Sequence, residues 1–118
     1  DVSDGLTGDL AHILSQSGVG ASVDRAALPR SAAMDEALAG PHRALALGCL
    51  VAGGDDYELC FTAWRAHRDR VEASGAAAGV RVSRVGVITR ARGLVVRDEA
   101  GTPLPELPAA FDHFEARP

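Results

Sequence analysis

Segments of this chain in which apolar residues have the periodicity of a helix are followed by segments in which they have the periodicity of a strand. Leu6, Leu10 and Leu14 recur every four residues, as they would on one face of a helix. The stretch 80–88 alternates apolar and polar side chains, which is typical of a strand. We predict helices over residues 5–17, 32–39, 42–51 and 64–78, and strands over residues 20–24, 57–62, 80–88 and 94–97. This mixture predicts an α/β or α+β fold, with helices packed on one mixed sheet.

Local signals fix several of these boundaries. Asp4 is placed to cap the first helix, Gly18 to end it, and Ser31 to cap the second helix. In the helix over 64–78, the side chains expected to face inward are those of Ala66, Val71 and Ala73. The tail over 109–114 is expected to make one helical turn.

The composition fits one compact globular domain. Hydrophobic residues make up 47% and charged residues 24% of the 118 positions, which predicts a folded chain. A net charge of −4 argues against nucleic acid or an anionic membrane as the main partner. Cys49 and Cys60 have no metal-site spacing, so we expect two buried thiols in a reducing cytosol. All 12 basic residues are Arg, which is typical of a GC-rich bacterial genome.

The first dense group of polar residues is Asp1-Val2-Ser3-Asp4-Gly5, directly before the first helix. In an extended chain, Asp1 and Ser3 project to the same side. Carboxylates crowded at such a turn repel each other unless a cation neutralises them. Mg²⁺ is the usual choice, because it prefers oxygen ligands and shares them with phosphates. The alternative is purely structural, with Asp4 as a helix cap and Asp1 as a solvated loop charge.

A second group is Gly53-Gly54-Asp55-Asp56-Tyr57, between a predicted helix and a predicted strand. Paired glycines allow the backbone to approach a ligand closely. A glycine C-cap followed by an Asx-turn accounts for both glycines and one aspartate. The second carboxylate has no structural role in that interpretation, which leaves a binding role open.

Several short blocks follow one another in a characteristic order and spacing. They are Asp1-Val2-Ser3-Asp4-Gly5-Leu6, Asp9-Leu10, Ser17-Gly18-Val19-Gly20-Ala21, Gly53-Gly54-Asp55-Asp56-Tyr57-Glu58-Leu59 and Phe111-Asp112-His113-Phe114. The first block recurs across the superfamily that includes aminoimidazole ribonucleotide synthetase and selenophosphate synthetase. Together with the second acidic block and the terminal aromatic block, it resembles the C-terminal part of bacterial thiamine-monophosphate kinase over essentially the whole chain.

The resemblance implies the C-terminal domain of the aminoimidazole ribonucleotide synthetase-like superfamily. It also implies an enzyme that transfers the γ-phosphoryl group of ATP to thiamine monophosphate, giving thiamine diphosphate. Position by position, Asp1 and Asp4 are implied as Mg²⁺ ligands and Ser3 as an ATP contact. Asp55 and Phe111 are implied as substrate-binding residues. No catalytic side chain is implied, because phosphoryl transfer needs metals and alignment more than covalent chemistry.

The chain begins at Asp1, inside the first acidic group and without a Met. We therefore expect 1–118 to be an incomplete C-terminal domain, inactive by itself, without its N-terminal ATP-binding domain. The resemblance implies a cytoplasmic homodimer for the full-length protein. Two alternatives stay open. One is another ATP-dependent enzyme of the superfamily, selenophosphate synthetase-like or aminoimidazole ribonucleotide synthetase-like, and the other is a stand-alone ligand-binding domain.

Overall fold

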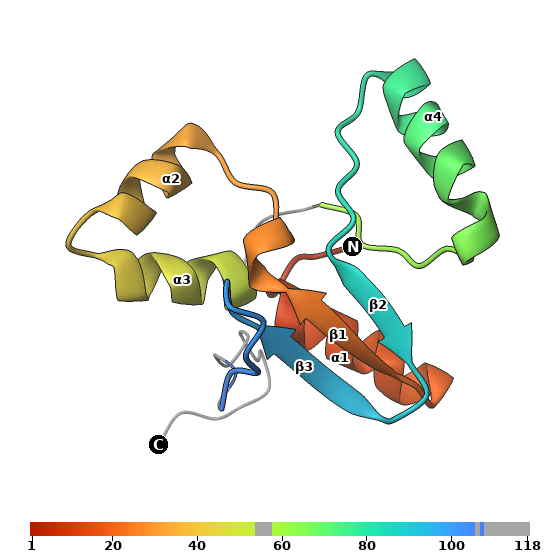
Figure 1. Cartoon of the computed structure of the whole chain (residues 1–118), viewed down its shortest axis with the longest axis horizontal. Coiled ribbons are helices and arrows are strands. Elements are labelled where there is room, and N and C mark those ends of the chain that lie inside the picture. The colour runs from red at the N-terminus through yellow and green to blue at the C-terminus, as the bar shows by residue number, and fades with distance from the viewer. Residues whose placement is uncertain (54–57, 106, 108–118) are drawn as a thin grey trace.

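The computed structural model describes residues 1–53, 58–105 and 107 (Figure 1). In chain order the helices are α1 (Leu6–Ser17), α2 (Ala32–Ala39), α3 (Arg43–Ala52) and α4 (Arg68–Ala78). The strands are β1 (Gly20–Asp24), β2 (Gly86–Thr89) and β3 (Gly93–Arg97), and short 3₁₀ turns span Arg25–Ala27 (η1) and Arg65–His67 (η2). The predicted α/β class, with helices on one mixed sheet, is confirmed.

The sheet has three strands in the order β2-β1-β3. β1 runs antiparallel to β2 and parallel to β3, so α2, α3, α4 and β2 all lie between the two parallel strands in sequence. The turn from β2 to β3 passes directly over the start of β1. A Cβ atom added at Gly20 would lie 1.9 Å from the backbone oxygen of Ala91, so only glycine fits there.

The core lies between α1 and one face of the sheet. Leu10 and Leu14 of α1 meet Ala21 and Val23 of β1 and Val96 of β3, all of them at most 6% exposed. These residues follow from the helical and strand repeats in the sequence. α1 ends as predicted at Gly18, which has a left-handed φ of 66°.

The helices α2 and α3 pack on each other beside this core, and α3 also contacts α1. Ser31 caps α2 as predicted, because its Oγ accepts a hydrogen bond from the backbone N–H of Met34 (3.1 Å). Val51, near the end of α3, is 2% exposed and joins the core. In the part of the chain that the structure describes, no helix has the length and apolar character needed to span a bilayer.

The region from residue 58 to residue 85, here called the α4 arm, differs from the sequence prediction. Within the predicted strand 57–62, the described residues form only an isolated bridge between Glu58 and Val2. The strand predicted over 80–88 is confirmed only from Gly86 to Thr89. The helix predicted over 64–78 begins as a 3₁₀ turn and becomes α-helical at Arg68. Outside this bridge and the pairing of β2 with β1, no strand ladder forms in these segments among the described residues.

The side chains of the α4 arm are also more exposed than predicted. Ala66 and Ala73 are exposed, Val71 is half-buried, and Gly75 is the buried residue of α4. Figure 1 shows α4 standing away from the sheet, with one extended segment entering it and a second extended segment leading from it to β2. The predicted inward face of this helix is therefore wrong for its two alanines, because no described element covers them.

The two thiols also differ from the prediction that both are buried. Cys49 on α3 is exposed, whereas Cys60 is half-buried and packs against the core. Burial raises the pKa of the Cys60 thiol. The prediction is therefore wrong for Cys49, which lies on the outer side of its helix.

Candidate functional site

In the loop over residues 1–5, one buried side chain lies between more exposed polar residues. Val2 is 5% exposed, and its backbone N–H donates to the Glu58 carbonyl (2.7 Å). Asp1 is exposed, and Ser3 and Asp4 are half-buried. The buried valine thus anchors the loop, while the polar residues on either side of it stay accessible.

A carboxylate in the first helical turns fixes the second half of this loop. Asp9 Oδ2 accepts hydrogen bonds from the backbone N–H groups of Ser3 (2.9 Å) and Asp4 (3.0 Å). The N-cap residue of α1 is Gly5, so the prediction that Asp4 occupies this position is wrong. Asp9 acts in the manner of a capping box, in which a side chain of the helix reaches back to preceding amide groups. The positions of Ser3 and Asp4 therefore depend on Asp9.

Gly5 brings the loop against the end of α3. It has a φ of 118°, a conformation that side chains other than glycine rarely adopt. A Cβ atom at this position would lie 2.6 Å from the backbone oxygen of Ala52. Close backbone contact between the first acidic loop and the C-terminal end of α3 therefore requires glycine here.

These contacts connect the loop to both sides of the second acidic motif. Ala52 lies directly before Gly53-Gly54-Asp55-Asp56, and Glu58 lies directly after Tyr57. Gly5 meets the first of these flanking residues and Val2 the second. Asp55 falls in the segment 54–57 and Phe111 in the tail, so both predicted substrate residues lie outside the described residues.

The first turn of α1 also contains a buried polar atom without a partner. Thr7 is 6% exposed, and its Oγ1 has no hydrogen-bond partner among the described residues. Burying a hydroxyl in this way typically costs about 1–3 kcal/mol. The helix end beside it favours negative charge, because its free N–H groups and its dipole point toward the loop.

The donor set of the loop fits a divalent cation of the hard, oxygen-binding kind. Asp1 and Asp4 provide two carboxylates on this loop, the first exposed and the second half-buried, and Mg²⁺ is commonly held by one or two carboxylates together with waters and substrate phosphates. Among residues 1–53, 58–105 and 107, no three His, Cys, Asp or Glu side chains gather into a group that could enclose a metal. The arrangement therefore suits an open site completed by other ligands.

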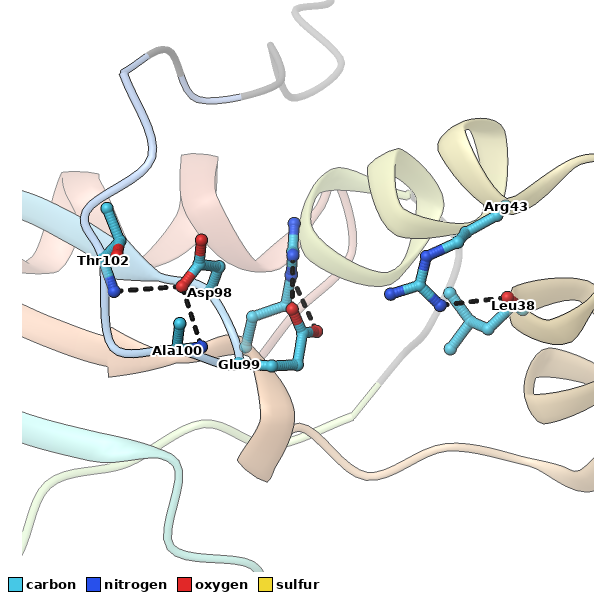
Figure 2. A network of polar contacts seen from close by, with 7 residues as sticks. Leu38, Arg43, Asp98, Glu99, Ala100 and Thr102 are labelled. Carbon is cyan, nitrogen blue, oxygen red and sulfur yellow. Dashed lines mark hydrogen bonds and ion pairs between the residues drawn. The ribbon is translucent and has the colours of Figure 1, made fainter.

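Other polar contacts lie away from this loop. Figure 2 shows the turn after β3, where Asp98 Oδ1 accepts hydrogen bonds from the N–H groups of Ala100 (2.9 Å) and Thr102 (3.0 Å). The neighbouring Glu99 pairs with Arg25 at 2.7 Å, and this hydrogen bond lowers the pKa of Glu99 to about 2. These contacts close a turn and tie it to η1, which is a structural role.

The chain is similar over nearly its whole length to several known proteins. The chain is 40% identical over 116 residues to thiamine-monophosphate kinase of Salmonella typhimurium, covering 97% of this chain and 34% of the kinase. The chain is 36% identical over 120 residues to the Haemophilus influenzae kinase, and this match covers 98% of this chain and 35% of the kinase. The crystal structure of the Stenotrophomonas maltophilia kinase superposes on this chain with a TM-score of 0.76 at 41% sequence identity. The match covers 88% of this chain and 31% of the kinase chain. No protein-family model matches the chain.

These matches confirm the resemblance to thiamine-monophosphate kinase. The chain spans about a third of the length of the kinases it matches. Its fold matches that of the Stenotrophomonas maltophilia kinase over 88% of this chain. The kinase activity, the substrates and the assembly of a full-length protein belong to the proposals below.

Sequence reasoning found the kinase-like acidic loop but missed two residues that shape it. From the sequence alone Asp9 is given no role, whereas its carboxylate accepts hydrogen bonds from two loop amides. An acid early in a helix, following two polar loop residues, is the signal that indicates this role. The contact of Gly5 with Ala52 joins positions 47 residues apart, and no local pattern indicates it.

Proposed function

We propose that this chain is the C-terminal part of an enzyme that transfers the γ-phosphoryl group of ATP to thiamine monophosphate, giving thiamine diphosphate. The observation that carries the proposal is that the first acidic loop contacts residues that flank the second acidic motif in the sequence. Val2 pairs with Glu58 and Gly5 packs against Ala52, so described residues before and after the segment 54–57 both lie against the loop over 1–5. The similarity to kinases of several bacteria supports the same function.

Within this proposal, Asp1 and Asp4 bind Mg²⁺ and Ser3 contacts ATP. Asp55 and Phe111 bind thiamine monophosphate, the carboxylate facing a cationic ring and the aromatic side chain stacking on it. The fixed loop supports these roles, because Asp9 holds the backbone of both Ser3 and Asp4. Because the Asp9 carboxylate holds both residues, the distance between the metal ligand Asp4 and the nucleotide contact Ser3 would stay constant.

The chemistry explains why the site is rich in acids. Both donor and acceptor are phosphates, so two anions must approach each other. Mg²⁺ supplies the positive charge when it is bound, and the protein's carboxylates position it. The acceptor phosphate is already ionised, so no general base is required from the chain. The protein then contributes alignment and electrostatic stabilisation, which are the usual demands of phosphoryl transfer.

The proposed enzyme needs more chain than is present here. An N-terminal ATP-binding domain would supply the remaining nucleotide and metal contacts, and the 118 residues alone would have no kinase activity. The full-length protein would be a homodimer in the bacterial cytoplasm. The open donor set supports this incompleteness, because two carboxylates alone leave most positions around a Mg²⁺ ion to other ligands.

The proposal can be tested in a chimera in which this chain replaces the matching third of the Salmonella typhimurium kinase. Asp4→Asn should lower kcat by about 100-fold or more, because it removes a charged metal ligand. Asp55→Ala should mainly raise KM for thiamine monophosphate. Asp69→Asn on exposed α4 is the matched control and should leave both constants unchanged.

The measurements are steady-state kinetics at several Mg²⁺ concentrations. Partial rescue of Asp4→Asn by high Mg²⁺ is expected, because a weakened metal site fills at higher metal concentration. Wild-type kcat in the Asp4→Asn chimera at low Mg²⁺ would contradict the metal role. ADP formation without any dependence on thiamine monophosphate would instead favour another acceptor of the same superfamily.

A further inference from the structure

The two extended segments of the α4 arm have apolar side chains on both sides of the chain. In the first segment, Cys60 packs against the core, whereas Leu59 is 82% and Phe61 59% exposed. Trp64, which ends this segment, is also 82% exposed. A strand with apolar residues on both sides is typical of a sheet covered on both faces. Here one side of the segment is covered and the other is not.

The second extended segment, between α4 and β2, repeats this arrangement. Val85 packs against the core, while Val80 and Val82 point away from it and are 61% and 39% exposed. Two segments far apart in sequence thus turn apolar side chains outward on the same arm of the molecule.

Outward side chains of both segments line one cleft with a volume of about 560 Å³. Its apolar lining consists of Phe61, Val80 and Val82 from the two segments and Val71 from α4. His67 and Arg70 lie at the same cleft and give it polar groups. Soluble monomers rarely leave a connected apolar surface with polar edges uncovered unless another surface binds there.

The inner residues of both segments also lack backbone hydrogen-bond partners within the part of the chain that the structure describes. Among the described residues, no backbone hydrogen bond joins 59–63 or 81–84 to another segment. The bridge between Glu58 and Val2 is a single rung at the beginning of the first segment. Exposed extended chain with free N–H and C=O groups is a template for an added strand. Sequence patterning predicts strands at both places, so the missing component is the partner.

We propose that this surface, made by residues 58–64 and 80–85 with the cleft between them, binds the part of the kinase polypeptide that the present chain does not span. The occupant would add strand pairing to the two extended segments and bury Phe61, Trp64, Val80 and Val82. The kinases that match this chain have about two thirds of their length outside the match, since the chain covers 34% of the Salmonella typhimurium kinase. That length provides a partner on the same polypeptide.

The inference rests on the correspondence with the kinase and is independent of which residues bind metal or substrate. Hydrogen–deuterium exchange measures it directly, because amides in a strand ladder exchange much more slowly than amides open to water. The isolated 118-residue chain is compared with the chimera described above. Amides of 59–63 and 81–84 should exchange at least about tenfold more slowly in the chimera. Those of α1 should be protected in both proteins and serve as the internal control.

Two further measurements decide the remaining outcomes. If the chimera does not fold, which loss of α1 protection would reveal, the Stenotrophomonas maltophilia kinase is measured at the matching positions. Fast exchange at those positions in a folded kinase overturns the proposal. Protection that appears in the isolated chain as its concentration rises also overturns it, because the occupant would then be a second copy. Unchanged turnover in Asp4→Asn with protection intact would contradict the metal site and leave the surface proposal standing, whereas fast exchange with the expected loss of turnover would contradict the surface alone.

Discussion

The α1–sheet core and the α4 arm have the same kinds of sequence pattern, but only the core forms a paired sheet with a covering helix. In the core, β1 has a partner on each side, and α1 covers one face of the sheet. In the arm, equally regular alternation yields extended chain with exposed Leu59 and Phe61. The difference shows that alternation of apolar and polar residues determines which side chains lie on each face of a strand. A strand forms only where a neighbouring segment pairs with its backbone N–H and C=O groups.

The largest expected contrast comes from one leucine in each region. Leu14→Ala should lower the free energy of unfolding by about 2–5 kcal/mol, because it opens a cavity beneath the sheet. Leu59→Ala should change it by less than about 0.5 kcal/mol, because that side chain is already 82% exposed. Urea unfolding of the 118-residue chain measures both. Equal losses in the two variants would break the comparison.

Two glycines, one in the core and one in the α4 arm, test whether backbone packing is tighter in the core. Gly20→Ala should destabilise by about 1–3 kcal/mol, because its new methyl would collide with the backbone oxygen of Ala91, 1.9 Å away. Gly75→Ala in α4 places its methyl 2.6 Å from a methyl of Val82 and 3.1 Å from the backbone oxygen of Val80, and a shift of this exposed extended segment can relieve both contacts. Its gain of up to about 1 kcal/mol in helix propensity offsets those contacts. Thermal unfolding followed by circular dichroism ranks the two, and a larger loss for Gly75→Ala contradicts the account.

The two cysteines test whether the arm is docked on the core. Cys49 is exposed, whereas burial raises the pKa of Cys60, so Cys60 has less thiolate at pH 8. A thiol reagent should therefore modify Cys49 first in the native chain, and the two should react at similar rates in urea. Mass spectrometry of tryptic peptides separates the sites. Faster native labelling of Cys60 would show that the arm is detached.

The smallest effect is expected from the ion pair that ties the turn after β3 to η1. Arg25 lowers the pKa of Glu99 from its ordinary value of 4.5 to about 2. A lowered pKa stabilises the fold above pH 4.5, and this contribution is lost as the pH falls from 4.5 toward 2. The Glu99 side chain is 45% exposed, so Glu99→Gln should cost only about 0.2–1 kcal/mol at pH 7. That difference should vanish near pH 2, and a gap that stays constant with pH would exclude the ionic origin.

The same contrast explains how much could be predicted from the sequence. Leu10 and Leu14 follow one helical face, and Gly18 and Ser31 carry their own capping signals, so α1, α2 and their ends were predictable. The strand over 57–62 was wrong in its described part, because pairing depends on a partner that local residues do not encode.

The candidate site divides in the same way. The acidic loop was predictable from its residue types, and the exposure of Asp1 beside buried Val2 follows from the alternation of an extended chain. The supporting contacts were not predictable, because the hydrogen bonds of Asp9 to the loop and the contact of Gly5 with Ala52 form only in the folded chain. Close approaches between distant segments depend on tertiary packing, which short motifs do not contain.

The most direct test of the account is phosphoryl transfer itself. The chimera and the isolated 118-residue chain are incubated with ATP and Mg²⁺, with and without thiamine monophosphate, and thiamine diphosphate is measured by chromatography. The account predicts thiamine diphosphate from the chimera only when thiamine monophosphate is present, and none from the isolated chain. Turnover by the isolated chain, or a folded chimera that makes no thiamine diphosphate, would contradict it.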